Sequence, residues 1–255
     1  MNTRAHVHAR RARHAAIAIG VFWLAASPAF AQAAKRTADG VPDLSGLWQV
    51  LDAAADDLQD HHASPGVRAG VGVVVGNEIP YQPWAAAKKK ENFEKRHTLD
   101  PESKCYLPGV PRLTFMPFPF QILQVKGQVL LVHEYVRAIR TVHTDGTPHP
   151  KGPIDWWLGD SRGRWDGDTL VVDSVHFNDQ TWLDRAGNFH SEELHVIERF
   201  TPEGPDHVRY RVTIEDPKVF TRPWDMETVL YRRKETQARL LEYECQGFAH
   251  EKLYP

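Results

Sequence analysis

The stretch of sequence that decides the fold is GDSRGRWDGDTLVVD, residues 159–173. The pair Asp166-Gly167 is typical of a type I′ turn, which joins two antiparallel strands because its central residues adopt positive φ. Thr169–Val175 leads directly out of this turn and has the pattern of a strand. These residues therefore predict a β-hairpin.

Similar runs on both sides of the hairpin predict further strands. They are Leu44–Val50, Phe120–Val125, Gln128–Thr141, Glu193–Phe200, His207–Ile214, Glu227–Arg233 and Leu240–Cys245. Lys126-Gly127 is a tight-turn candidate between two of them, and Asp145-Gly146 is a second type I′ signal. Most connections are short, as in a meander of neighbouring strands.

Only one helix is expected. Pro83–Lys95 carries helix-forming residues with a proline near its start. The proline-rich segment Leu107–Pro119 is expected to be extended and to lie outside the central strands, because proline cannot donate a ladder hydrogen bond. About nine or ten strands and one helix predict an all-β fold, an antiparallel meander that closes into a calycin- or lipocalin-like barrel.

Residues 1–31 have the pattern of a signal peptide. Its parts are the basic residues Arg4, Arg10, Arg11 and Arg13, the apolar run Ala15–Ala26, and the small residues Ala29 and Ala31. Cleavage before Gln32 is expected, which leaves residues 32–255 as a single domain in the periplasm or outside the cell. A twin-arginine signal is the alternative interpretation of the basic region.

The charge balance bears on the partners. The chain has 31 Lys and Arg against 33 Asp and Glu, and four of the Arg belong to the expected signal peptide. A mildly acidic remainder without a basic stripe argues against a nucleic-acid partner. No other apolar run has the length of a membrane span. A small molecule is the expected partner. The oligomeric state stays open.

Cys105 and Cys245 are the two cysteines of the chain. A disulfide between them is expected in an oxidising compartment, and two free thiols are the alternative.

Two resemblances support this interpretation. Gly46-Leu47-Trp48 resembles the G-x-W motif in the opening strand of lipocalins, whose barrels carry small hydrophobic ligands. The phrases GVPDLSGLW (40–48), GDSRGRWDGDTLVVD (159–173) and SEELHVIERF (191–200) resemble a group of exported bacterial proteins of undefined function. That resemblance implies an exported β-rich domain without an assigned chemistry. A small residue is usual in that group where this chain has His176.

The strand Glu193–Phe200 holds the strongest catalytic candidate. Strand alternation places Glu198 on the same side as apolar residues. Desolvation there favours the protonated form of a carboxyl group, which suits a general acid. The alternative is a buried ion pair with Arg137 or Arg140.

His195, His190 and Asp160 are the other candidates for proton transfer, because imidazoles and carboxylates exchange protons near neutral pH. The two histidines are also conceivable metal ligands, with Glu192 or Glu193 as a third. Spacings such as HExxH are absent, so no metal is expected.

A ligand pocket is expected from the density of aromatic residues. Trp165, Trp182 and Trp224 are candidates for stacking on a ring. Tyr135 and Arg137 share one side of their expected strand, which lines a cavity if that side faces inward and is ordinary surface if it does not.

Two function classes remain open. The favoured one is an exported enzyme that performs acid/base chemistry, as a lyase, isomerase or hydrolase, on a small sugar or aromatic compound. The alternative is a periplasmic carrier of lipocalin-like type that binds a small ligand without chemistry. No cofactor is expected, because the chain has no P-loop, GxGxxG or GxSxG motif. An acid and a base in the same cavity would favour the enzyme.

Overall fold

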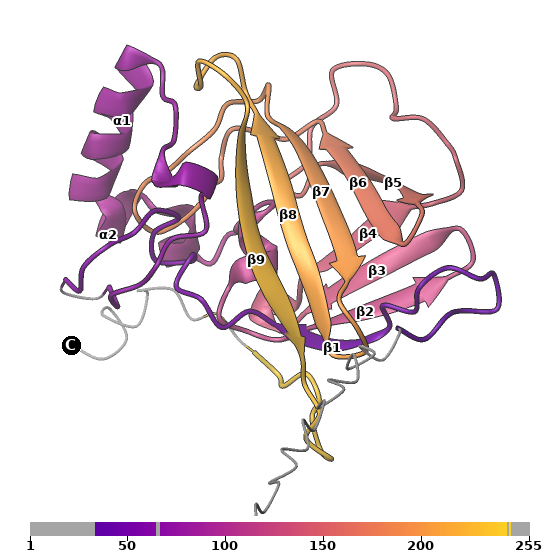
Figure 1. Ribbon diagram of the computed structural model, residues 1–255. Coiled ribbons are helices and arrows are strands. Elements are labelled where there is room, and N and C mark those ends of the chain that lie inside the picture. The colour runs from indigo at the N-terminus through magenta and orange to yellow at the C-terminus, as the bar shows by residue number, and fades with distance from the viewer. Residues whose placement is uncertain (1–33, 65–66, 244, 246–255) are drawn as a thin grey trace, which may run out of the picture. The chain divides into compact units, whose positions relative to one another are not determined.

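The computed structural model describes residues 34–64, 67–243 and 245. These residues form nine strands that close into a barrel in chain order, with the last strand paired to the first (Figure 1). The strands are β1 (Gly46–Gln49), β2 (Phe120–Val125), β3 (Gln128–His133), β4 (Ile139–His143), β5 (Asp160–Asp166), β6 (Thr169–Val175), β7 (His195–Pro202), β8 (His207–Glu215) and β9 (Trp224–Arg232). The predicted all-β barrel is confirmed.

The helices are short. They are α1 (Pro83–Glu94), α2 (Arg96–Leu99) and α3 (Arg112–Phe115), with the 3-10 turns η1 (Val75–Asn77), η2 (Pro101–Lys104) and η3 (Tyr135–Arg137). Pro83 begins α1, as the sequence predicts. Within the described ranges no helix is both long and apolar enough to cross a membrane.

The hairpin predicted around Asp166-Gly167 forms. β5 and β6 pair antiparallel up to Asp166 and Thr169, so Gly167 lies in the turn, with φ at +57°. The β2–β3 turn is similar, since Val125 pairs with Gln128 around Lys126-Gly127. Both hairpins form where the sequence predicts them, but the β5–β6 turn is not of type I′, because of its central residues Gly167 and Asp168 only Gly167 has positive φ.

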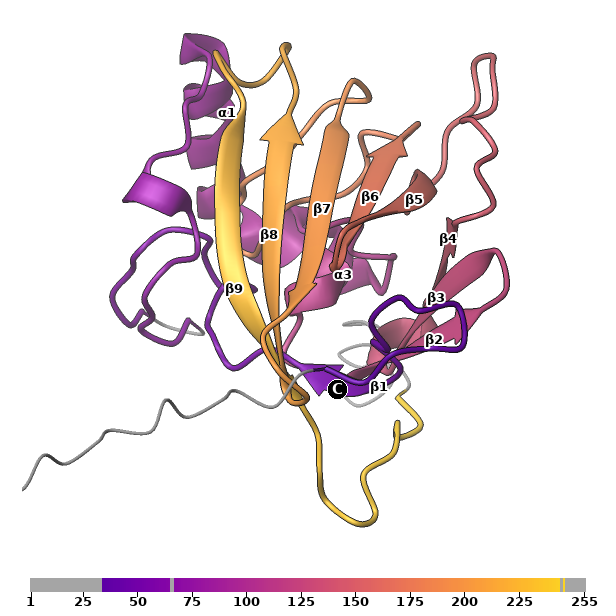
Figure 2. The ribbon, with the colours of Figure 1, turned by 45° about the vertical axis from the view of Figure 1, so that its right-hand side comes forward.

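One strand pair departs from the antiparallel meander. β4 and β5 run parallel, with Val142 opposite Ser161. A parallel pair needs a crossover connection, and residues 144–159 supply it at the right of the barrel in Figure 2. Asp145-Gly146 therefore lies in this crossover, and the prediction of a hairpin there is wrong.

Three other predictions need correction. The expected strand Gln128–Thr141 is broken by η3, where Val136 adopts a φ of +47° that an extended strand does not allow. Leu107–Pro119 contains the helical turn α3 and is not extended throughout. Leu240–Tyr243 has no strand pairing, so the expected last strand is absent from the part of the chain that is described.

α3 fills the barrel interior. All four of its residues are buried, and Figure 2 shows it behind β7 and β8, on the inside of the barrel. Leu113 and Phe115 of α3 belong to the same buried hydrophobic cluster as large side chains of the strands, among them Trp48, Phe120, Phe200 and Tyr210. The interior is therefore a packed core, as in small barrels.

The barrel closes through contacts between β1 and β9. The Arg232 guanidinium lies 4.2 Å from the centre of the Trp48 ring, a cation–π distance. It also donates to the carbonyl oxygens of Ser45 (2.7 Å) and Pro205 (2.7 Å). Gly46 leaves room for it, because a Cβ there would lie 2.0 Å from an Arg232 nitrogen. The G-x-W motif thus marks the position where the barrel closes.

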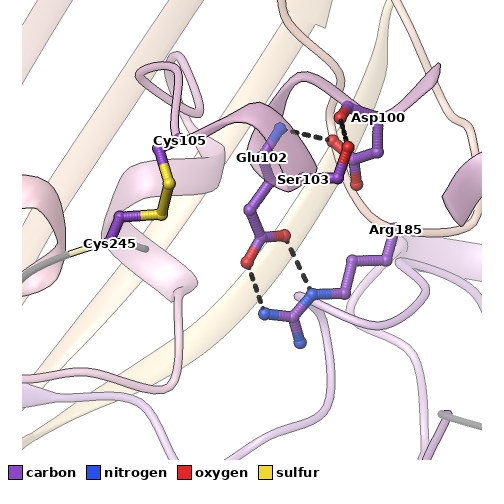
Figure 3. The surroundings of a disulfide bond; sticks show 6 residues. All are labelled: Asp100, Glu102, Ser103, Cys105, Arg185 and Cys245. Atoms are coloured by element: carbon purple, nitrogen blue, oxygen red, sulfur yellow. Dashed lines mark hydrogen bonds and ion pairs between the residues drawn. A yellow bond between two sulfur atoms is a disulfide. The ribbon is translucent and has the colours of Figure 1, made fainter. Parts of the chain in front are cut away.

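A disulfide joins Cys105 to Cys245, as the sequence predicts (Figure 3). The sulfur atoms lie 2.15 Å apart and the Cα atoms 5.6 Å apart. Cys105 directly follows η2, so the bond fixes Cys245 to the segment that precedes α3. The disulfide closes the loop between Cys105 and Cys245, which reduces the entropy of the unfolded chain and stabilises the fold by about 2–4 kcal/mol.

Charged side chains beside the disulfide hold α3 in place inside the barrel. Arg112 of α3 is fully buried and donates to both carboxylate oxygens of Asp100, at 2.9 and 2.8 Å, and to Glu102. Arg185 donates to the same Glu102 at 2.6 and 2.9 Å (Figure 3). Asp100 also caps η2 by accepting a bond from the backbone N–H of Glu102 (3.0 Å). The buried cation is therefore paired and hydrogen-bonded, as burial of a charge requires.

The substitution Gly46→Ala tests the closure of the barrel. The new methyl group displaces Arg232 from Trp48, so we expect the free energy of unfolding to fall by about 1–3 kcal/mol more than in the control Gly40→Ala. Gly40 also has positive φ, +79°, but open space around it, so its substitution measures backbone strain alone. Urea unfolding of the two variants gives the comparison. Equal losses would show that the contact with Arg232 is unimportant.

Candidate functional site

The centre of the barrel holds a buried ion pair. Glu198 accepts hydrogen bonds from both terminal nitrogens of Arg140, one at 2.9 Å, and from the Tyr210 hydroxyl at 2.6 Å. Arg140 donates further to Ser161 (3.0 Å) and Ser174 (2.9 Å). All five side chains are buried. Five consecutive strands, β4 to β8, therefore meet in one hydrogen-bond network.

This network identifies the partner of Glu198. The sequence left open a general acid or an ion pair with Arg137 or Arg140, and the structure has the ion pair with Arg140. Burial, followed by the Glu198 carboxylate, raises the pKa of Tyr210, so the hydroxyl keeps the proton that it donates. With these partners Glu198 has a structural role, and a ligand site is expected elsewhere in the molecule.

One end of the barrel carries an aromatic groove of about 510 Å³. Its aromatic lining residues are Trp84, Trp182 and Phe189, and its cationic ones are Lys88 and Lys218. Trp84 is 55% exposed, and its ring lies edge-on to Phe189 with centroids 5.9 Å apart. Its indole N–H donates to the Lys218 carbonyl (3.2 Å), which fixes the ring. An exposed, fixed indole is a surface on which a ligand ring can stack.

Local structure explains why these aromatic residues meet. Trp182 and Phe189 face each other across an antiparallel bridge, closed by a bond from the N–H of Leu183 to the carbonyl of Asn188 (2.6 Å). The carboxylate of Asp184 accepts from two backbone N–H groups inside this turn, at 2.9 and 3.1 Å.

Helix α1 is held against this turn and brings Trp84 with it. The buried Asn92 amide donates to the Gly187 carbonyl (3.2 Å). A Cβ on Gly187 would lie 2.7 Å from that of Asn92, so the helix approaches closely only because residue 187 is a glycine. The aromatic groove is therefore a preformed feature of the fold.

A second cavity, of about 620 Å³, lies beside the aromatic groove, and we call it the histidine cavity. The residues that line it include His176, His195, Asp155, Glu193, Ile154 and Phe177. Glu192 lines both cavities, and Lys218 of the aromatic groove pairs with Glu192 (2.6 Å) and with Glu193 of the histidine cavity (3.0 Å). The two cavities thus adjoin at the same end of the barrel.

His176 has an unusual backbone and a fixed ring. Its φ is +62°, in the left-handed region that side chains other than glycine seldom adopt. Its Nε2 lies 3.0 Å from the Pro150 carbonyl oxygen, which can only accept, so Nε2 carries the hydrogen. Nδ1 is then the ring's acceptor. The small residue usual at this position in the resembling group suits the same φ.

The predicted catalytic residues His195 and Asp160 belong to one row of alternating carboxylates and histidines on the outer face of the barrel. His195 contacts Glu215 through Nδ1 (3.0 Å) and Asp173 through Nε2 (3.2 Å). His149 contacts the same Asp173 oxygen through Nε2 (3.1 Å) and Asp160 through Nδ1 (2.6 Å). We call these five residues the histidine–carboxylate row.

His190 does not join this row. Its Nδ1 contacts the Ser191 carbonyl (2.8 Å), and its Nε2 contacts the Thr181 hydroxyl (2.6 Å). Burial lowers its pKa, which favours the neutral ring. His190 lines the aromatic groove and His195 lines the adjoining histidine cavity, so the two histidines lie in neighbouring cavities with different partners, and their joint role in proton transfer stays a prediction. Nowhere in the described ranges do three or more His, Cys, Asp or Glu residues form a group that could hold a metal ion.

Of the three predicted tryptophans, Trp182 alone lines a cavity described above. Trp165 is partly buried and packs against the core. Trp224 is buried and lies edge-on to Phe220, with ring centroids 5.4 Å apart. These two indoles act in packing, the commoner role of a lone tryptophan.

Tyr135 and Arg137 lie on η3, far from a continuous strand face. Tyr135 is buried between Phe118 and Tyr243, with ring centroids 5.3 and 5.1 Å away. Arg137 is exposed and pairs with Glu242 (2.8 Å). The helical turn η3 replaces the expected strand, so the prediction that both residues share one strand face is wrong, and neither residue lines the aromatic groove or the histidine cavity.

Three residues of these sites have no distinctive signal in the sequence. Trp84 stands among helix formers, and its exposure depends on how α1 docks. Phe189 and His149 lie in connections, where periodicity gives no side. Comparisons of the chain with family models, with curated proteins and with solved structures find no match, so the function is argued from this geometry.

Glu198→Gln tests the structural role of the ion pair. Loss of the charge leaves Arg140 buried without a counter-ion, so we expect the free energy of unfolding to fall by about 3–5 kcal/mol. The control is Glu203→Gln, which breaks an exposed pair with Arg209 and should cost less than about 1 kcal/mol. Chemical unfolding of both variants measures the difference. A loss as small as the control's would return Glu198 to the candidates for catalysis.

Proposed function

We propose that this protein binds a small molecule with a sugar or aromatic ring in the aromatic groove, outside the barrel interior. The observation that carries this proposal is the contrast between the two places. The barrel interior holds the buried helix α3 and the buried Arg140–Glu198 network. The aromatic groove offers an exposed indole at its edge and a volume within the usual range of small-molecule sites.

The lining of the groove limits the class of ligand. A flat ring fits against Trp84, because the faces of sugars and aromatic rings stack on indoles. Hydrogen bonds with Glu192 and then Glu193 raise the pKa of Lys218 to about 12, so this residue stays a cation. Cations and carboxylates together at the groove favour a ring that carries hydroxyl or acidic substituents.

Binding without chemistry is supported better than the acid/base enzyme of the sequence hypothesis. That enzyme needed His195, His190, Glu198 and Asp160 to move protons in one place. Glu198 is committed to Arg140, and both ring nitrogens of each histidine have partners. A lipocalin-like binding or carrier protein needs no such residues.

A second candidate function rests on His176. His176 lines the histidine cavity, and the hydrogen bond from Nε2 to the Pro150 carbonyl leaves Nδ1 as the nitrogen without a hydrogen in a neutral ring, the form that a general base requires. A lyase or isomerase acting on a ligand that extends from the aromatic groove would use this nitrogen. His176→Gln would abolish such an activity and leave binding in the aromatic groove unchanged.

We also infer that the protein is exported. The expected signal peptide lies outside the described residues, so this inference rests on the sequence pattern and on the disulfide between Cys105 and Cys245. Disulfides persist mainly in oxidising compartments. The resemblance to exported bacterial proteins agrees with a periplasmic or secreted binding protein.

Trp84→Ala tests the proposed binding site. The probe is 1-anilinonaphthalene-8-sulfonate, an aromatic anion whose fluorescence rises on binding. Losing the stacking surface should weaken its binding about tenfold, which corresponds to roughly 1.4 kcal/mol. Fluorescence titration of the native protein gives the dissociation constants.

The matched control is Tyr231→Ala. Tyr231 is also an exposed aromatic residue, 37% accessible, but it lies on β9 and lines neither cavity. It should leave the affinity within about twofold of the wild-type value, since a remote surface substitution removes no contact with the probe. Equal affinities of Trp84→Ala and the wild type would exclude the aromatic groove as the binding site.

A further inference from the structure

Two turns line both the aromatic groove and the histidine cavity. In the first turn Ser191 lines the groove and Glu193 lines the cavity, and in the second Lys218 lines the groove and Pro217 the cavity. The buried carboxylate of Asp216 joins these turns. It accepts hydrogen bonds from the backbone N–H (2.6 Å) and hydroxyl (2.9 Å) of Ser191 and from the backbone N–H of Lys218 (3.2 Å). The junction between the two cavities is therefore a fixed part of the fold.

The side chain of Lys218 shows how closely the two cavities adjoin. Its Nζ lies 2.6 Å from the carboxylate of Glu192, which lines both cavities, and 3.0 Å from that of Glu193, which lines the histidine cavity. A cation of the aromatic groove thus already contacts a carboxylate of the histidine cavity. A ligand in the groove needs only a short chain of atoms to cross the same junction.

The two cavities differ in the charges that line them. Both lysines, Lys88 and Lys218, line the aromatic groove. The histidine cavity is lined by the carboxylates of Asp155, Glu192 and Glu193 and, among the described residues, by no Lys or Arg. Lys218 pairs with the two glutamates, whereas Asp155 forms no ion pair within the part of the chain that the structure describes. The cavity can therefore take a positively charged group beside Asp155.

An apolar surface leads to Asp155. Ile154 and Phe177 line the histidine cavity, and Ile154 is 39% exposed although its side chain is a large hydrophobic one. An alkyl chain that crosses the junction covers Ile154 and ends near the next residue, Asp155. Removing this apolar surface from water stabilises the bound chain.

We propose that the two cavities form one site for an elongated ligand, whose ring lies on Trp84 and whose short alkyl chain carries a protonated amine to Asp155. The inference rests on the proposed function, since the aromatic groove must hold the ring. An ammonium group donates three hydrogen bonds, which matches carboxylates that can only accept. A ligand with an anionic end meets like charges in the histidine cavity and is rejected.

Three fluorescent probes that share one naphthalene ring system test this inference. Dansylamide has no chain, N-pentyldansylamide adds an alkyl chain, and dansylcadaverine ends the same chain in a primary amine that is protonated at neutral pH. Fluorescence titration of the native protein gives the three dissociation constants. We expect the alkyl chain to increase the affinity about fivefold through apolar burial. We expect the amine to increase it about fivefold again, the upper end of what one exposed ion pair contributes.

Two variants assign these gains to residues of the histidine cavity. Asp155→Asn removes the charge that faces the amine and should bring dansylcadaverine within about twofold of N-pentyldansylamide, since only a weak hydrogen bond then remains. Ile154→Ser removes the apolar surface and should abolish the gain from the alkyl chain. Both side chains are exposed, so neither change removes a contact of the buried core. The control Asp166→Asn also changes an exposed aspartate, but one that lines neither cavity, and should keep both gains.

A dansylcadaverine affinity no higher than that of N-pentyldansylamide would overturn the inference, and so would an amine gain that Asp155→Asn leaves unchanged. Trp84→Ala tests the aromatic groove separately, because it should weaken the binding of dansylamide, which has no chain. If dansylamide depends on Trp84 and the amine gives no gain, this inference alone fails. If dansylamide binding is independent of Trp84, the proposed function fails.

Discussion

The buried ion pair between Arg140 and Glu198 is the constraint on which the arrangement of this barrel depends. Two charges in a packed interior are stable only with complete hydrogen bonding, and Ser161, Ser174 and Tyr210 provide it from the intervening strands. Each of these strands must keep its register, because a shift by one residue would turn its polar group outward. The centre of the barrel is thereby occupied by this network, and the aromatic groove and the histidine cavity lie at one end of the barrel.

Much of the fold could be predicted from the sequence, because its decisive features are local. A turn such as Asp166-Gly167 and a short alternating run determine a hairpin without reference to the rest of the chain. The parallel pairing of β4 with β5 could not be predicted, since it depends on where the crossover of residues 144–159 returns to the sheet. The break at Val136 was equally hidden, because its positive φ follows from packing and not from residue type.

The candidate site was predicted in part, for a related reason. Two of the predicted residues, His195 and Asp160, do belong to one row. What joins them is His149, which lies in an irregular segment whose direction no periodicity reveals. Trp84 became part of the site only because Asn92 docks its helix against a glycine. Contacts of this kind exist only in three dimensions.

The proposed function requires that ligands bind at the end of the barrel and not inside it. The most direct test is a crystal structure of the protein soaked with 1-anilinonaphthalene-8-sulfonate. We expect the naphthalene ring to lie against Trp84 and Phe189, with the contact between Arg140 and Glu198 intact. A ring inside the barrel, with Arg140 displaced from Glu198, would contradict it.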